Sequence, residues 1–214
     1  YKKDNLSLNS IEGFIRQVLG WREYMQGIYH YLGEDYANHN WFEHQEPLPA
    51  FFWDSNQTEM NCLKQVLSQV ENTDYAHHIQ RLMILSNFAL IFGCSPQEIE
   101  NWFHSVFIDA YDWVMVPNVI GMGLHADGGK MMTKPYAAGG AYISRMTNFC
   151  GGCKYNPKLR VGENACPFTT LYWDFLDRHR EDFSKNHRMA QQVRGLDRLS
   201  DLPELRIQAK KWLD

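Results

Sequence analysis

Residues 82–92 of the chain read Leu-Met-Ile-Leu-Ser-Asn-Phe-Ala-Leu-Ile-Phe, a strongly apolar run. A helix that is apolar all round has to be covered on every side, so we expect this segment at the centre of the domain. Thr73 or Asp74 can cap the helix that contains it, because either side chain can accept a hydrogen bond from a first-turn amide. The run therefore predicts a domain of helices packed around one central helix.

Helical signals continue on both sides of this run. Before it, apolar residues recur at helical spacing from residue 11 to residue 19, and Gly20 is expected to end that helix. After it, Ser95 can cap a helix, Pro96 suits the first turn and Glu98 can close a capping box. We expect this second helix to reach about Tyr111.

Residues 117–140 have a different character. Six glycines and Pro135 interrupt them too often for long helices, and no β-type alternation replaces the helical pattern. We expect a long, ordered, functional loop, with helices resuming near Ala141, after Cys166 and at Pro203. The predicted fold class is all-α, without repeats or low-complexity tracts.

Composition indicates one globular domain, which we assign to residues 1–214. The chain is 44% hydrophobic and 21% charged, with no apolar run long enough to cross a bilayer, so we expect a soluble monomer without membrane contact. A formal net charge of −4 argues against a protein that is basic all over and coats nucleic acid without choosing a site. Tyr1 stands where an initiator Met would, and no signal-peptide core follows, so we expect a piece of a longer chain.

Any contact with DNA must therefore use a local patch. Lys and Arg cluster in the last third of the chain, interleaved with aromatic residues, although a solvated helical face is the favoured interpretation for most of them. The cluster comprises Lys154, Lys158, Arg160, Arg178, Arg180, Lys185, Arg188, Arg194 and Arg198.

Four of the five cysteines form a pattern that suits a metal–sulfur centre. Cys62 stands alone, Cys150 and Cys153 form a C-x-x-C with two glycines between them, and Cys166 precedes a proline. Nothing marks the chain as secreted, so metal ligation is favoured over disulfides. The remaining residue, Cys94, is interpreted as a small buried hydrophobe.

Zinc and an iron–sulfur cluster both accept four thiolates. A structural zinc site usually brings two closely spaced pairs, whereas here two ligands come singly from distant segments. A cysteine followed by proline also resembles the end of bacterial ferredoxin cluster motifs. Spacing favours a cluster, with zinc second and a redox dithiol third.

Five segments resemble the bacterial iron–sulfur photolyases and cryptochromes, the photolyase-related proteins. The resemblance extends over essentially the whole chain, and all four patterned cysteines fall at the family's 4Fe-4S ligand positions. The segments are 20–25 (GWREYM), 75–81 (YAHHIQR), 107–113 (FIDAYDW), 117–118 (PN) and 134–142 (KPYAAGGAY).

The resemblance implies the family's carboxyl-terminal helical domain, which binds FAD and one 4Fe-4S cluster. It implies a bacterial, cytoplasmic DNA photolyase that reverses pyrimidine (6-4) pyrimidone photoproducts in UV-damaged DNA. The family also carries an amino-terminal α/β antenna domain, of which these 214 residues show no trace.

The resemblance also assigns the residues of the lesion site. His78 matches the active-site histidine that protonates the damaged base, a task that suits an imidazole whose pKa is near neutral. His77 is a second catalytic candidate, and Tyr136 is expected to line the lesion pocket. Animal-type (6-4) photolyases carry a further histidine where this sequence has Leu82.

Four residues match flavin-binding positions. Arg81 and Asn118 would supply the positive charge and the polar partner that a reduced flavin needs. Asp109 is expected to bond the ring or ribityl chain, and Asp112 either binds the cofactor or braces Arg81.

Trp53 and Trp102 match the family's electron-transfer chain of aromatic residues. Beside Trp102, however, Phe103 replaces a tyrosine, and phenylalanine is far harder to oxidise. Two alternatives to repair remain open: a cryptochrome-like photoreceptor that uses the same cofactors, and a primase-like iron–sulfur module that binds nucleic acid without flavin.

Overall fold

The computed structural model describes residues 6–213, which fold entirely into helices and loops; Tyr1 lies outside this range. The two backbone bridges in this range, Glu46 with Cys94 and Asn156 with Ala165, are isolated and form no sheet. The α-helices are α1 (Leu8–Ile15), α2 (Arg22–Leu32), α3 (Asn61–Thr73), α4 (His78–Gln80), α5 (Asn87–Phe92), α6 (Pro96–Val106), α7 (Asp112–Val116), α8 (Gly140–Met146), α9 (Pro167–Arg178), α10 (Arg180–Lys185), α11 (Ala190–Leu196) and α12 (Leu202–Leu213).

Shorter helical segments connect these elements. Four are 3-10 helices: η2 (Glu34–Asn38), η3 (Ala50–Phe52), η4 (Ser55–Gln57) and η7 (Phe149–Gly152). Three are π-helices: η1 (Arg16–Trp21), η5 (Arg81–Ser86) and η6 (Pro117–Gly123). None of the helices among residues 6–213 is both long and apolar enough to span a bilayer.

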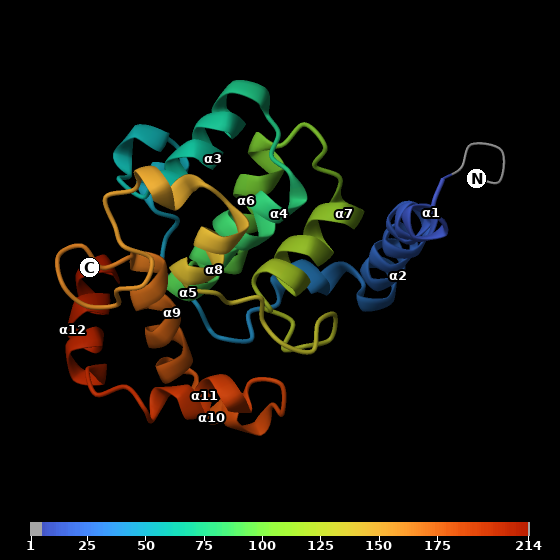
Figure 1. Ribbon diagram of the computed structural model, residues 1–214. Helices are drawn as coiled ribbons and strands as arrows, with labels where there is room; N and C mark the ends of the chain where they lie inside the picture. The colour runs from blue at the N-terminus through green and yellow to red at the C-terminus, as the bar shows by residue number, and fades with distance from the viewer. Residues whose placement is uncertain (1–5, 214) are drawn as a thin grey trace.

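The prediction of a central apolar helix is confirmed. Every residue of α5 is buried, and the helix packs against α9, which in turn packs against α12 (Figure 1). The amide of Asn87 bonds Ala138 in both directions, at 2.8 and 2.9 Å, and so satisfies the polar groups of a fully buried side chain. The predicted cap of this helix was wrong. Asp74 instead ends α3 in the left-handed conformation, and His77 caps the start of α4.

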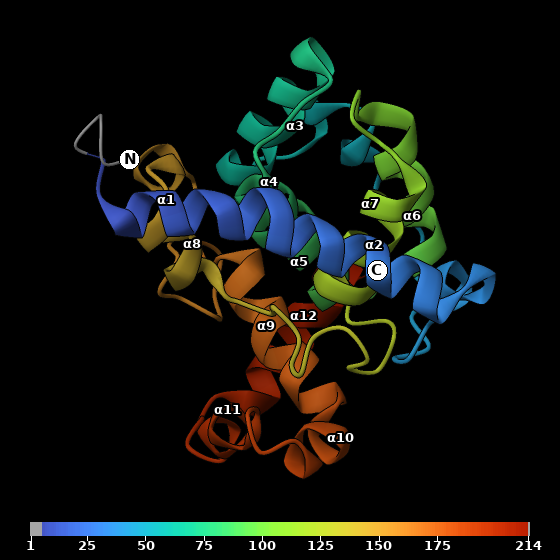
Figure 2. The ribbon, with the colours of Figure 1, turned by 90° about the vertical axis from the view of Figure 1, so that its right-hand side faces the viewer.

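The expected break at Gly20 is also wrong. The chain stays helical from α1 through η1 into α2, and one long helix crosses the face of the molecule in Figure 2. The wider π turn of η1 contains Gly20, and the helix ends only at Gly33, whose φ of 74° needs a glycine. The side chain of Ser7 caps the start of α1.

The helix starts at Ser95, Cys166 and Pro203 agree with the structure. Ser95 precedes Pro96 as expected, but Glu98 accepts a bond from the Leu48 amide at 2.6 Å instead of closing a capping box. That helix ends at Val106, earlier than predicted. The segment expected to be all loop begins with η6, so only residues 124–139 lack regular structure.

Candidate functional site

A cleft of about 910 Å³ opens between the long amino-terminal helix and the segments α4–η5 and α7–η6. All three π-helices contribute to its walls, and π-helical turns occur frequently at functional sites. Six of the predicted site residues line it: His77, His78, Arg81, Asp109, Asn118 and Tyr136.

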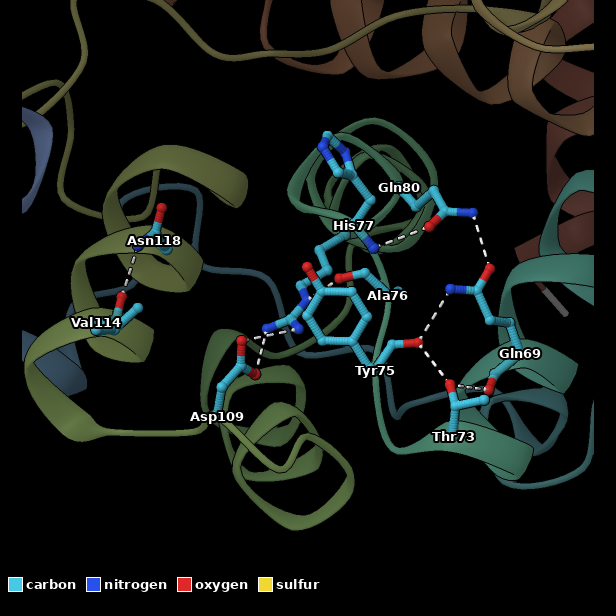
Figure 3. A network of polar contacts seen from close by, with 10 residues as sticks. Gln69, Thr73, Tyr75, Ala76, His77, Gln80, Asp109, Val114 and Asn118 are labelled. Carbon is cyan, nitrogen blue, oxygen red and sulfur yellow. Dashed lines mark hydrogen bonds and ion pairs between the residues drawn. The ribbon is translucent and has the colours of Figure 1, made fainter. Parts of the chain in front are cut away.

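Arg81 is fixed from four sides. Its guanidinium pairs with both carboxylate oxygens of Asp109 at 2.8 and 3.1 Å, and its Nε donates to the Ala76 carbonyl at 2.7 Å. The centroid of the Tyr75 ring is 5.0 Å from the guanidinium carbon and that of the Phe107 ring 3.9 Å from it; Figure 3 shows Tyr75 and Asp109. Fork-shaped pairing and stacking between rings hold this cation in one orientation in the cleft wall.

Asn118 belongs to η6 and lines the same cleft as Arg81, which begins η5. Its Nδ2 donates to the Val114 carbonyl at 2.7 Å, as Figure 3 shows, while its Oδ1 is buried and has no partner among the described residues. A buried polar atom without a partner costs free energy unless a ligand or solvent satisfies it. Asn118 therefore lines the cleft and carries one buried polar atom that no described residue satisfies.

The two adjacent histidines have different environments. The Nδ1 of His77 accepts the Ile79 amide at 3.2 Å and caps α4, while Gln80 bonds the His77 amide in return. His78 is open to the cleft, yet enough protein surrounds it that desolvation, followed by the charges of Arg81 and His77, lowers its pKa. His78 is thus a neutral imidazole, available for proton exchange, at neutral pH.

Asp112 does not brace Arg81, and this part of the prediction is wrong. Asp109 is the ion-pair partner, whereas Asp112 lies on the far side of α7 with its Oδ1 3.7 Å from the Nε2 of His104. His104 in turn contacts Glu100 at 2.7 Å. Asp109 lies in the turn before α7, whereas Asp112 is the first residue of that helix and is directed toward His104.

The aromatic residues are arranged around Trp102, which is buried and donates its Nε1 to the Phe52 carbonyl at 3.1 Å. Ring contacts lead from Trp102 to Phe103 (5.3 Å between centroids) and on to Phe107 (5.1 Å), which covers Arg81. Trp53 is 62% exposed and follows Phe52, whose ring packs edge-on against Trp102 at 5.1 Å.

Sequence reasoning missed Arg22 as a cleft residue. Its guanidinium carbon lies 4.8 Å above the Trp113 ring, and it makes no ion pair with a carboxylate in the described part of the chain. It belongs to the segment 20–25 that carries the family resemblance, and that membership was the available signal.

The four patterned cysteines surround a second, smaller cavity. Cys62 lies in the first turn of α3, Cys150 in η7, Cys153 directly after η7 and Cys166 at the start of α9. The Asn61 amide donates to the Phe149 carbonyl at 2.8 Å and joins the first two segments. Cys94 is fully buried elsewhere, with its Sγ 3.9 Å from the Pro47 carbonyl.

The surroundings of this cavity have opposing effects on negatively charged sulfur. Gly140 leaves space there, because a Cβ at this position would lie 2.7 Å from the Cys166 Sγ and 3.0 Å from the Thr169 Oγ1. Burial raises the pKa of the Cys166 thiol to about 11, while bonds from Thr169 and Phe168 oppose that rise. Two helix amino termini, of α3 and α9, also face the cavity and favour negative charge.

No group of three or more Cys, His, Asp or Glu side chains within residues 6–213 is arranged to hold a metal ion, so the structure itself identifies no metal at these cysteines. A tetrahedral zinc site needs every sulfur about 2.3 Å from one centre. In a cluster each thiolate binds a different iron, so its four ligands stand further apart.

The chain is 51% identical to a (6-4) photolyase of Agrobacterium fabrum over 215 aligned residues, which cover 100% of this chain. The chain belongs to the bacterial photolyase-related family. It spans 42% of the length of that photolyase. A protein of uncharacterised function from Acanthamoeba polyphaga mimivirus is 36% identical over 101 residues, 47% of this chain and 75% of the viral protein. No protein-family model matches the chain.

Proposed function

We propose that this chain is the flavin- and lesion-binding domain of a DNA photolyase that reverses pyrimidine (6-4) pyrimidone photoproducts. The observation that supports it most is the cleft, where His78, Tyr136 and the fixed pair of Arg81 and Asp109 face one cavity. Its volume of about 910 Å³ lies within the range of cofactor sites. The A. fabrum relative, named a (6-4) photolyase, supports the same function.

FAD is the proposed cofactor of this cleft. When bound and reduced, it would supply the light-excited electron that the repair reaction requires. Arg81 would hold positive charge against the reduced ring, Asp109 keeps Arg81 oriented, and Asn118 is a polar side chain in the same cleft wall. The stacked Arg22 adds a second positive charge along the cleft wall.

His78 is the proposed proton donor to the damaged base. The His78 residue lines the cleft, and its side chain makes no hydrogen bond with the described residues. His77, in contrast, uses its Nδ1 for capping. Tyr136 lines the same cleft and would contact the lesion. A flipped base is the fitting substrate, because damaged bases stack poorly and leave the duplex at lower cost.

The four cysteines are proposed to hold one 4Fe-4S cluster with a structural role. Trp102 and Trp53 are proposed to conduct electrons toward the flavin, and Phe103 in the path would make that route slow. UV-damaged DNA is the proposed partner, together with an antenna domain in the same polypeptide, and we expect a cytoplasmic monomer.

The test is illumination of the full-length, flavin-reduced protein with a duplex that carries one defined (6-4) lesion. Restored pyrimidines in the light and none in the dark are expected. A matched pair of variants ties the result to the cleft: Asp109→Asn should lose flavin and repair, whereas Asp112→Asn should keep both.

Two other outcomes would contradict this function. A flavin-loaded protein that responds to light without repairing the lesion would be a cryptochrome-like photoreceptor. A protein that contains iron but no flavin absorbance would instead be a primase-like nucleic-acid-binding module.

A further inference from the structure

A second hollow lies away from the cleft, on helix α11. It has a volume of about 420 Å³ and is walled by polar and basic side chains that fall on one face of the segment 187–198. Gly195 forms part of its floor, because a Cβ there would lie 3.2 Å from the Trp173 ring. The hollow is lined by His187, Ala190, Gln191, Arg194, Gly195 and Arg198, and we call it the basic hollow.

The positive charge of the basic hollow is not neutralised by its neighbours. Arg194 and Arg198 are exposed, as is Arg188 beside them, and none of the three pairs with a carboxylate within residues 6–213. The nearby carboxylates already have other partners. Asp197 pairs with Arg180 at 2.6 Å, Asp201 with Arg160 at 2.8 Å and Asp182 with Lys185 at 3.6 Å.

The basic hollow is joined to the edge of the large cleft. The turn between α10 and α11 is attached to the loop of residues 124–139, where the Asn186 Nδ2 donates to the Thr133 carbonyl at 2.9 Å. Tyr136, three residues after Thr133, lines the cleft. Lys134 lies between these two residues, is exposed and has no carboxylate partner in the described part of the chain. Both ribbon views show this loop beside α10 (Figures 1 and 2).

We infer that Arg188, Arg194 and Arg198 bind the phosphodiester backbone of DNA next to the lesion, as a contact separate from the cleft. Unpaired guanidinium groups suit phosphate because they form two parallel hydrogen bonds with it. A chain with a net charge of −4 needs such a local patch to attract a polyanion. This inference rests on the proposed function, since the cleft would hold the lesion and Lys134 would lie between the two sites.

The experiment measures binding of the full-length holoprotein to an undamaged DNA duplex over a range of salt concentrations. The variant Arg188→Gln/Arg194→Gln/Arg198→Gln should bind more weakly at low salt. The slope of its log affinity against log salt concentration should become shallower by about 0.9 for each phosphate that is no longer bound, or by about 3 in total. Because undamaged DNA is the probe, the result does not depend on repair.

A matched control carries the same change of charge elsewhere. Lys158→Gln/Lys210→Gln/Lys211→Gln removes three exposed lysines that pair with no carboxylate among residues 6–213, and it should leave the slope near that of the wild type. An unchanged slope in the arginine variant would overturn the inference. The inference would also fail if the arginine variant lost binding to poly-glutamate but kept its binding to DNA, because the hollow would then be assigned to an acidic protein. If the wild type binds DNA through these arginines but repairs no lesion, only the proposed function fails.

Discussion

His78 and His77 are neighbours in sequence that the structure assigns to different tasks. His78→Ala removes the proposed proton donor, so we expect the rate of photorepair to fall about 10²–10⁴-fold while flavin content stays constant. His77→Asn keeps a capping acceptor for α4 and should retain repair. Single-turnover photorepair with flavin absorbance on both proteins measures the difference, and the reverse ranking would contradict the assignment.

The pH dependence of repair follows from the environment of His78. Desolvation, Arg81 and His77 hold its pKa below 6.5, so the imidazole is mostly neutral above that pH. A proton donor must be protonated, and repair should therefore rise as the pH falls through 6.5 and below it. A rate that rises with pH instead would exclude His78 as the donor.

Among the residues that the sequence assigned to one site, five lie together in the structure. His78, Arg81, Asp109, Asn118 and Tyr136 come from motifs far apart in the chain, yet they line one cleft. The resemblance supplied these positions, whereas it could not tell which aspartate meets Arg81. That choice depends on the conformation of the turn before α7, where Asp109 lies, and spacing does not reveal it.

Among the elements, α8 is the one that connects the two candidate sites. Gly140 begins it beside the Cys166 Sγ, and Tyr142 lines the cleft. Gly140→Ala should lower stability by about 1–3 kcal/mol through overpacking and reduce iron content, because its Cβ would meet the sulfur at 2.7 Å. Urea unfolding and iron analysis measure both effects.

Gly151→Ala is the matched control for that substitution. Gly151 lies in the same cysteine segment, but a Cβ there meets nothing within 4 Å. Iron content should remain that of the wild type. Equal iron in both alanine variants would show that Gly140 is not required for space at the cysteine cavity.

The elements also show where sequence patterns stop being informative. The apolar run of α5 and the proline-marked starts of α6 and α9 were predictable, because burial and backbone restriction act locally. The π-helices η1, η5 and η6 were not, since an extra residue in a turn leaves no compositional mark. Gly20 in η1 and residues 117–123 were misassigned for this reason.

Across the whole molecule, the pair formed by the buried His44 and the half-buried His179 should control stability in acid. His44 and His179 meet through their Nε2 atoms at 3.3 Å beside Phe42. Burial is the main cause that lowers their pKa values, to about 3 for His44 and about 4 for His179. Below pH 6.5 the unfolded chain therefore binds more protons than the folded one, and stability is lost as pH falls from 6.5 toward these values.

A double variant tests this pair. His44→Gln/His179→Gln retains hydrogen-bonding groups without titrating, so its free energy of unfolding should fall less steeply between pH 6.5 and 4 than that of the wild type. Each group contributes up to about 1.4 kcal/mol per pH unit. Urea unfolding across this range gives the slope, and His30→Gln on the exposed surface of α2 should leave it unchanged.

A cluster bound by the four cysteines should increase the stability of the whole fold. Its four proposed ligands come from α3, the η7 segment and α9, so a bound cluster would cross-link parts that are distant in sequence. Metal binding that requires the folded arrangement adds to folding free energy. Cys62→Ser should therefore lose iron and lower the Tm, by about 2–4 °C for each kcal/mol of stability removed.

Flavin retention should fall in the same variant, because α8 begins at the cysteine cavity and continues into the cleft wall. Cys94→Ala separates this effect from the removal of any buried thiol, since Cys94 is just as buried but lies outside the cavity. Its iron and flavin contents should match the wild type even if its Tm falls. Iron loss from Cys94→Ala, with full iron in Cys62→Ser, would overturn the ligand set. Iron loss without flavin loss in Cys62→Ser would instead show that the two sites are independent and that α8 does not couple them.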